Sequence, residues 1–149
     1  MAKFLYFAYG SNLHMRQFKR RCPGSTVAGR ARLADHRLAF TRYDTKRKGG
    51  VADIVPEPGA EVWGALYEID GSDLAALDAY ENVPRSYRRE TVTVVDDAGA
   101  LREVIVYIAN QTGHFAPSKQ YLGLIVDSAI EHGLPDEYVE SLRQVATYA

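Results

Sequence analysis

At residues 7–13 the sequence reads FAYGSNL, and the structure expected for this stretch decides how the rest of the chain is arranged. The aromatic-rich run from Lys3 to Tyr9 predicts a short buried strand, which Gly10 ends. A helix is expected directly afterwards, from about Leu13 to Arg20. The N-terminal segment therefore predicts a strand that passes through a glycine into a helix.

A junction of this kind can bind a negatively charged group. Gly10 lets a ligand approach the main chain closely, and the first N–H groups of a helix have no partners within it. These groups lie at the positive end of the helix dipole, so they can hold an anion or the oxyanion that forms on an attacked carbonyl. The alternative is an ordinary turn in which Ser11 or Asn12 caps the helix. The local sequence leaves both interpretations open.

The rest of the chain predicts an α+β fold. Strands are expected at Thr26–Leu33, His36–Thr41, Gly50–Val55, Glu61–Ile69, Arg88–Val95 and Arg102–Ile108. Helices are expected from about residue 70 to Tyr80, after Ser118, and from about Asp136. The connections are a charged loop at Tyr43–Gly49, a turn at Glu57–Gly59 and a hairpin at Asp96–Gly99. This order favours one domain over residues 1–149, with a mainly antiparallel, barrel-like sheet and helices packed outside it.

The composition argues against several classes of partner. Lys and Arg number 18 and Asp and Glu number 19, so the net charge is −1 and neither nucleic acid nor an anionic membrane is expected. The single cysteine, Cys22, excludes an internal disulfide, and the four histidines lack the spacing of metal ligands. The N-terminal apolar run is too short for a secretion signal, and no stretch is long enough to span a bilayer. A soluble, cytoplasmic protein without a metal is therefore expected.

Glu81 is the candidate catalytic residue. It follows the predicted helix that carries Leu74, Leu77 and Tyr80, and a carboxylate at a helix C-terminus faces the negative end of the dipole. Burial beneath Tyr80 and Tyr87 would raise its pKa further, which suits a general base near neutral pH. The alternative is an exposed glutamate at a frayed helix end.

Other polar residues carry weaker indications. Ser11 lacks the Gly-x-Ser-x-Gly context of a nucleophile, and the sequence pairs no histidine with Cys22. The basic runs Lys19–Arg21 and Lys46–Lys48 are interpreted as solvated surface, because no aromatic residues alternate with them. Arg88 could face a substrate carboxylate or solvent, and its role stays open.

Several segments, in order along nearly the whole chain, resemble the γ-glutamylcyclotransferase-like family, which includes AIG2-like proteins and cyclotransferases of butirosin maturation. The matching segments are Phe7–Leu13, Gly50–Ile54, Val62–Tyr67, Leu77–Glu81, Tyr87–Arg89, Pro117–Tyr121 and Glu131–Tyr138. Asn82 departs from the pattern, since many relatives have glycine after the catalytic glutamate. Asparagine is the next best residue for a left-handed helix end, so the backbone can be kept.

The resemblance implies a small mixed, mainly antiparallel β-barrel with flanking helices. It also implies an enzyme that acts on a small γ-glutamyl substrate. The α-amine of the γ-glutamyl group attacks its own γ-carbonyl and releases 5-oxoproline and an amine or amino acid, without a metal or cofactor. Two other functions stay open: an amide hydrolase in which Glu81 activates water, and a catalytically silent ligand-binding protein of this fold. The leaving amine and the oligomeric state are not predicted.

The resemblance also assigns roles to individual residues. Glu81 is expected to be the general acid and base. Substrate-binding groups are expected at Tyr9, Gly10, Ser11, Asn12, Leu13, Tyr87 and Tyr121.

Overall fold

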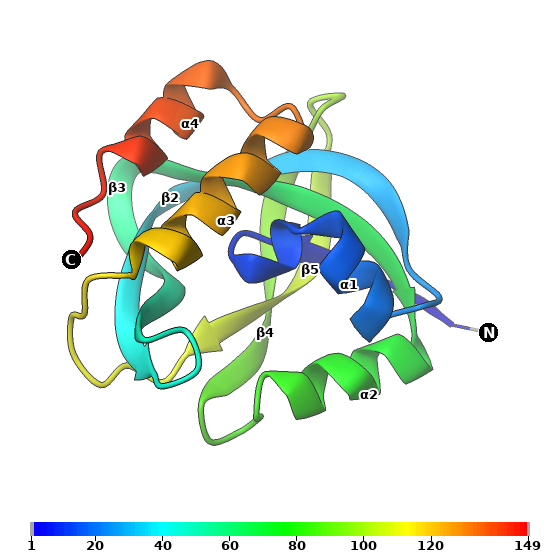
Figure 1. Ribbon diagram of the computed structural model, residues 1–149. Coiled ribbons are helices and arrows are strands. Elements are labelled where there is room, and N and C mark those ends of the chain that lie inside the picture. The colour runs from blue at the N-terminus through cyan, green and yellow to red at the C-terminus, as the bar shows by residue number, and fades with distance from the viewer. Residues whose placement is uncertain (1, 149) are drawn as a thin grey trace.

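The computed structural model describes residues 2–148, and the strands in this range form a closed barrel (Figure 1). Around the barrel the order is β1 (Lys3–Ala8), β3 (Gly49–Asp70), β2 (Thr26–Asp44), β4 (Tyr87–Asp96) and β5 (Leu101–Ala109). Neighbouring strands are antiparallel except β1 and β5, which pair in parallel where Tyr6 meets Ile105 and so close the barrel. The predicted α+β class and mixed, mainly antiparallel barrel are confirmed.

The two longest strands, β2 and β3, form one hairpin where the sequence suggested four separate strands. The turn predicted at Glu57–Gly59 is wrong, because residues 57–60 instead bulge out of β3 opposite Asp35. The N–H of Gly59 donates to Asp35 Oδ1 at 3.0 Å, and both residues have positive φ angles, 83° for Gly59 and 58° for Asp35. A Pro-Gly pair such as residues 58–59 is compatible with a bulge in a strand as well as with a turn that reverses the chain. The predicted charged loop shrinks to the turn at residues 45–48.

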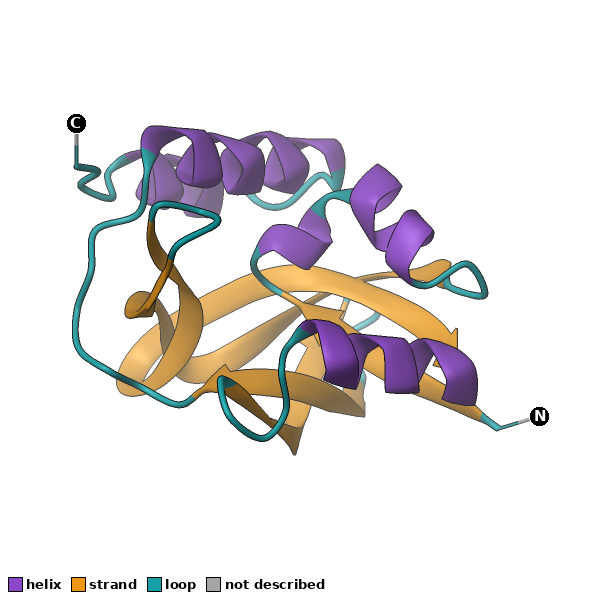
Figure 2. Cartoon of the chain, turned by 60° about the horizontal axis from the view of Figure 1, so that its bottom comes forward, coloured by secondary structure: helices purple, strands orange, loops and turns teal. Residues whose placement is uncertain are grey.

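The helices form a row across one face of the barrel (Figure 1). They are the 3-10 helix η1 (Ser11–Leu13) and the α-helices α1 (Met15–Arg21), α2 (Gly71–Tyr80), α3 (Lys119–Glu131) and α4 (Asp136–Arg143). Figure 2 shows most of these helices above the strands and α2 in front of them. Only residues 9 and 10 separate β1 from η1. In the described part of the chain, no helix is long and apolar enough to cross a membrane.

Side-chain caps fix where these helices begin. Ser118 accepts a hydrogen bond from the N–H of Tyr121 at 3.1 Å, so it caps α3 as predicted. The caps predicted for α1 are wrong, because η1 separates this helix from β1. His14 is the N-cap instead, and its Nδ1 accepts from the N–H of Gln17 at 3.1 Å. The side chain of Asn12 therefore does not cap α1, and it lines a cavity instead.

The end of β1 is held rigidly before it reaches η1. Ala8 is fully buried and pairs with Ala65 of β3. A side chain on the neighbouring Gly64 would collide with the carbonyl oxygen of Ala8, so a glycine is needed for this close approach. Phe18 of α1 is fully buried and stacks on Tyr67 of β3 with ring centroids 4.1 Å apart. The strand and the helices on either side of Gly10 are therefore fixed by close packing.

Candidate active site

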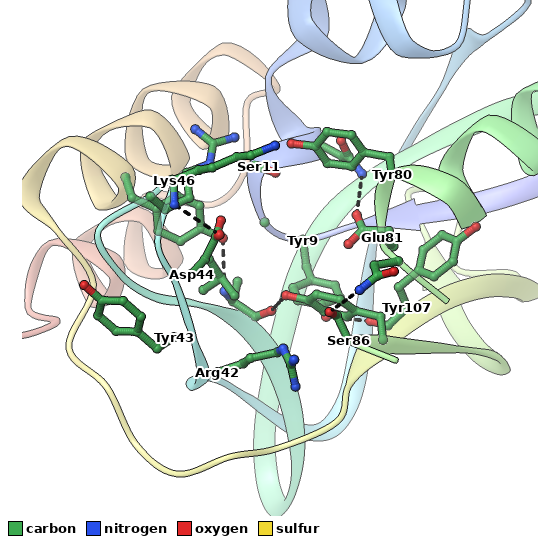
Figure 3. Close-up of a pocket in the computed structure, with 18 of the residues that line it drawn as sticks. Tyr9, Ser11, Arg42, Tyr43, Asp44, Lys46, Tyr80, Glu81, Ser86 and Tyr107 are labelled. Atoms are coloured by element: carbon green, nitrogen blue, oxygen red, sulfur yellow. Dashed lines mark hydrogen bonds between the residues drawn. The ribbon is translucent and has the colours of Figure 1, made fainter. Parts of the chain in front are cut away.

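A cavity of about 590 Å³ opens where β1 meets η1, between the end of α2 and the β2–β3 turn. Seven of the eight residues predicted for the site line it: Tyr9, Gly10, Ser11, Asn12, Glu81, Tyr87 and Tyr121. Figure 3 shows Glu81 on one side of this space, and Asp44 at the end of β2 and Lys46 of the β2–β3 turn on the other. Residues from eight helices and strands line this one volume, which is large enough for a small-molecule ligand.

Leu13 is the predicted site residue that does not line the cavity. Its side chain is fully buried in the core. Its N–H donates to the carbonyl of Gly10 at 3.0 Å, and its own carbonyl accepts from His132 Nε2 at 2.8 Å. Leu13 therefore stabilises the Gly10–Leu13 turn from the core, and its N–H is not available to a ligand. Gly10 lines this site, and its N–H has no acceptor among the described residues.

Glu81 follows the last residue of α2, and its N–H donates to the carbonyl of Leu77 at 2.8 Å. Its side chain is partly buried, and Oε1 accepts from Asn12 Nδ2 at 3.3 Å. Asn82, the next residue, has a φ of 55°, so asparagine does keep the left-handed helix end. The Asn82 side chain donates to Ser86 Oγ at 3.0 Å. It therefore has a partner of its own beside the carboxylate.

Burial raises the pKa of Glu81 from 4.5 to about 7. Three neighbours oppose the shift: first the positive charge of Arg21, then the hydrogen bond from Asn12, then the charge of Arg47. The carboxyl group is consequently poised to gain or lose a proton near neutral pH. This is the property expected of a group that takes a proton in one step and returns it in the next.

The tyrosines of the cavity differ in the hydrogen bonds they can still make. Tyr9 donates to the carbonyl of Tyr107 at 2.6 Å, and Tyr87 donates to the carbonyl of Ala52 at 3.0 Å. The hydroxyl of Tyr121 instead accepts from the N–H of Ala52 at 3.0 Å. A phenol carries one hydrogen, so Tyr121 keeps its own donor free for a ligand while Tyr9 and Tyr87 do not.

Two arginines that the sequence placed on the solvated surface belong to this site. Arg21 NH1 donates to Asn12 Oδ1 at 2.5 Å, and the guanidinium of Arg47 lies 5.3 Å from the ring centre of Tyr121. Interpretation of both basic runs as solvated surface is therefore wrong for these residues. Arg21 could have been found by periodicity, because it lies three residues after Phe18, on the buried side of α1. Nothing local marks Arg47, whose position depends on the long hairpin.

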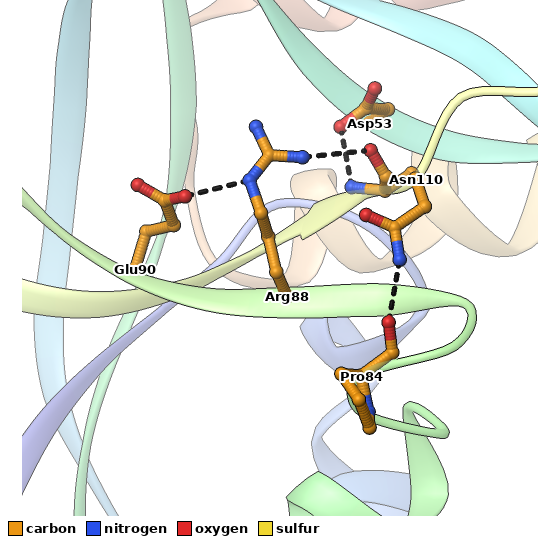
Figure 4. A network of polar contacts seen from close by, with 6 residues as sticks. Asp53, Pro84, Arg88, Glu90 and Asn110 are labelled. Carbon is orange, nitrogen blue, oxygen red and sulfur yellow. Dashed lines mark hydrogen bonds and ion pairs between the residues drawn. The ribbon is translucent and has the colours of Figure 1, made fainter.

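Arg88 lies outside the cavity. Its Nε donates to Glu90 Oε2 at 2.6 Å, and both side chains are exposed (Figure 4). Behind this pair, the fully buried Asp53 accepts from Thr41 Oγ1 at 2.8 Å and from the N–H of Ala109 at 2.9 Å. Asp53 is thus a structural carboxylate that ties β2 and β3 to the end of β5. Within residues 2–148, no cluster of three His, Cys, Asp or Glu side chains could hold a metal.

Comparisons with known proteins identify the family and the fold of this chain. The sequence profile of the AIG2-like family matches residues 61–142. The human protein called gamma-glutamylcyclotransferase is 37% identical over 147 residues, which cover 95% of this chain and 78% of the human one. The mouse protein of the same name is 35% identical over the same shares. A solved structure of a gamma-glutamyl cyclotransferase superimposes with a TM-score of 0.95 at 34% identity, over 99% of this chain and 90% of that one.

Proposed function

The chain belongs to the γ-glutamylcyclotransferases of the AIG2-like family, and from that premise we propose that it cyclises a γ-glutamyl amide with Glu81 as general acid and base. One observation carries the proposal. A carboxyl group with a pKa of about 7 lines the same cavity as Gly10 and Tyr121, whose N–H and O–H groups have no acceptor among the described residues.

The reaction moves one acyl group and one proton. The α-amine of the substrate attacks its own γ-carbonyl, a new C–N bond closes a five-membered ring, and the original amide C–N bond breaks. The products are 5-oxoproline and a free amine. Because attack is intramolecular, the protein mainly has to hold the substrate in a folded conformation. No electrons are transferred and no further reactant is consumed.

In this proposal Glu81 carries out both proton transfers. As a carboxylate it takes a proton from the substrate α-ammonium, which makes that nitrogen nucleophilic. It then returns a proton to the departing nitrogen, because both nitrogens are bonded to the same carbon in the tetrahedral intermediate. A pKa of about 7 allows both transfers near neutral pH, since neither protonation state is strongly favoured.

Two donors can stabilise the oxyanion or hold the substrate. The N–H of Gly10 and the hydroxyl of Tyr121 both border the cavity, and a Cβ built on Gly10 would lie 3.6 Å from that hydroxyl. Donors that are already in place need no reorganisation as charge develops on the oxygen. The N–H of Leu13, which donates to Gly10, is left out of this role.

The direct test measures 5-oxoproline released from a panel of γ-glutamyl amino acids and γ-glutamyl amines. Carrying out the reaction in ¹⁸O-labelled water separates the two kinds of chemistry, because hydrolysis places the label in free glutamate and cyclisation leaves 5-oxoproline unlabelled. Labelled glutamate would establish an amide hydrolase. Binding of the panel by calorimetry without any product would establish a silent ligand-binding protein.

The charge of the cavity rim favours a leaving group that carries a carboxylate. The rim contains Arg42, Lys46 and Arg47, and none of these three forms an ion pair among the described residues. Asp44, the last residue of β2, is the one carboxylate beside them in the cavity lining. Excess positive charge on the side opposite Glu81 suits an amino acid leaving group better than a simple amine.

Replacing Arg47 with methionine should therefore alter substrate choice. At about pH 9, where Glu81 is ionised with or without the Arg47 charge, we expect KM for γ-glutamylalanine to rise about tenfold with little change in kcat. A tenfold rise is the size of one lost charged hydrogen bond. For γ-glutamylethylamide, which lacks the leaving-side carboxylate, KM should stay nearly constant. Steady-state kinetics on both substrates measure the difference. Lys48→Met is the matched control, because Lys48 is exposed on the same turn and does not line the cavity. Equal changes in KM for both substrates would rule out a leaving-group contact.

A further inference from the structure

Arg21 joins two parts of the site that surround Glu81. This residue ends α1, and its NH1 donates to Asn12 Oδ1 at 2.5 Å. Its NH2 donates to the hydroxyl of Tyr80, and its Cζ lies 3.4 Å from the centre of the Tyr80 ring. Tyr80 is the residue immediately before Glu81. One guanidinium therefore contacts both the side chain that bonds to Glu81 and the helix end that carries it.

The contact with Asn12 determines which way its amide points. A guanidinium has only donors, so it can bond to the oxygen of an amide and not to the NH2 group. With Oδ1 directed at Arg21, Nδ2 is directed at the other side, where it donates to Tyr6 hydroxyl at 2.9 Å and to Glu81 Oε1 at 3.3 Å. A reversed amide would place its oxygen against the Glu81 carboxylate, where two acceptors would repel each other.

We infer that Arg21 is a positioning residue for the reaction: it holds the amide of Asn12 so that its NH2 group faces the Glu81 carboxylate, and it ties the end of α1 to the end of α2 beside that carboxylate. This inference rests on the proposed role of Glu81. It explains the position of a charged side chain that is partly buried and forms no ion pair among the described residues.

The surroundings of Glu81 make the effect measurable. The charged groups that act on it are Arg21 from α1 and Arg47 from the β2–β3 turn. The other titratable groups that interact with it are phenols whose pKa burial raises: Tyr6 on β1, Tyr9 after it, Tyr87 on β4, Tyr107 on β5 and Tyr121 on α3. These phenols stay uncharged in the range where Glu81 titrates. Loss of Arg21 therefore raises the pKa of Glu81, and no phenolate forms to obscure the shift.

The experiment compares Arg21→Met with Arg20→Met across the pH profile of kcat/KM. Arg20 precedes Arg21 on the same helix turn, is exposed, and does not line the cavity. We expect Arg21→Met to move the acid limb upward by about one pH unit, so that activity at about pH 6 falls about tenfold further than activity at about pH 9. Arg20→Met should follow the wild-type profile. An equal loss at every pH, or an unmoved acid limb, would overturn the inference.

A double-mutant cycle tests whether Arg21 acts through the amide. Asn12→Ala and Arg21→Met are measured alone and together at about pH 9, where Glu81 is ionised in every variant and the direct effect of the Arg21 charge on its pKa no longer changes the rate. Folding is checked by circular dichroism. If Arg21 works by orienting Asn12, the double variant should lose no more than about threefold beyond Asn12→Ala alone, because interacting residues are not additive. Multiplied losses would show that the two residues act independently and would contradict the inference. Failure of the proposed function itself has a different signature, namely a Glu81→Gln variant that keeps its activity.

Discussion

Glu81→Gln is expected to lower kcat/KM for a γ-glutamyl amino acid by about a thousandfold, within the range seen when a general acid–base group is removed. Glutamine has nearly the same shape and can still accept the hydrogen bond from Asn12, which is 3.3 Å from Oε1 in the wild type. It cannot take the proton from the α-ammonium group, however. The loss should therefore appear in kcat, with KM changed much less. Release of 5-oxoproline measured under saturating and limiting substrate separates these two constants.

A control variant shows whether the loss belongs to this carboxylate. Glu68→Gln makes the same chemical change on an exposed residue of β3 that does not line the cavity, and it should keep wild-type kinetics. The acid limb of the wild-type profile should lie at about pH 7, since the pKa of Glu81 is about 7 and the carboxylate is the active form. Full turnover by Glu81→Gln would remove Glu81 from the mechanism, whatever the state of the fold.

The barrel could be predicted from the sequence because its elements follow local rules. Strands of alternating or apolar character are separated by recognisable turns, and Ser118 marks the start of α3. The errors arose where one local signal has two structural outcomes. Pro-Gly at residues 58–59 produced a bulge, and the candidate caps Ser11 and Asn12 entered a 3-10 helix. In both places the partner strand or helix, distant in the sequence, decides the outcome.

The residues of the candidate site likewise fall into those that local sequence signals mark and those that only tertiary packing places. Gly10 and Glu81 stand at the ends of a predicted strand and a predicted helix, so their chemistry could be proposed in advance, and the resemblance joined them. Arg21 and Arg47 lie inside basic runs, and the charge of a run does not reveal which member faces inward. Their positions depend on how α1 packs against α2 and on how far the β2–β3 hairpin extends over the barrel. Such tertiary placement has no short-range signal apart from the spacing of Arg21 after Phe18.

Glu81→Gln is also expected to make the protein more stable above neutral pH. The folded-state pKa of Glu81 is raised, to about 7 from an ordinary value of 4.5, because burial disfavours the carboxylate. A raised pKa means that the folded protein binds this proton more tightly than the unfolded chain does. The stabilising contribution of the proton is therefore complete below about pH 4.5 and is lost as the pH rises through about 7. A neutral glutamine never undergoes this loss.

The expected gain at about pH 8 is on the order of 3 kcal/mol in the free energy of unfolding, or roughly 10 °C in Tm, and at about pH 5 it should fall below about 1 kcal/mol. Urea unfolding of Glu81→Gln and wild type at both pH values measures the difference, with Glu68→Gln as the control that should show no such dependence. A gain that is the same at both pH values would mean that the carboxylate is not the source. If the gain follows pH as expected, the group that carries out proton transfer is also one that weakens the fold. The site then keeps a partly buried carboxylate for its chemistry at a cost in stability, as expected where function requires a pKa near 7.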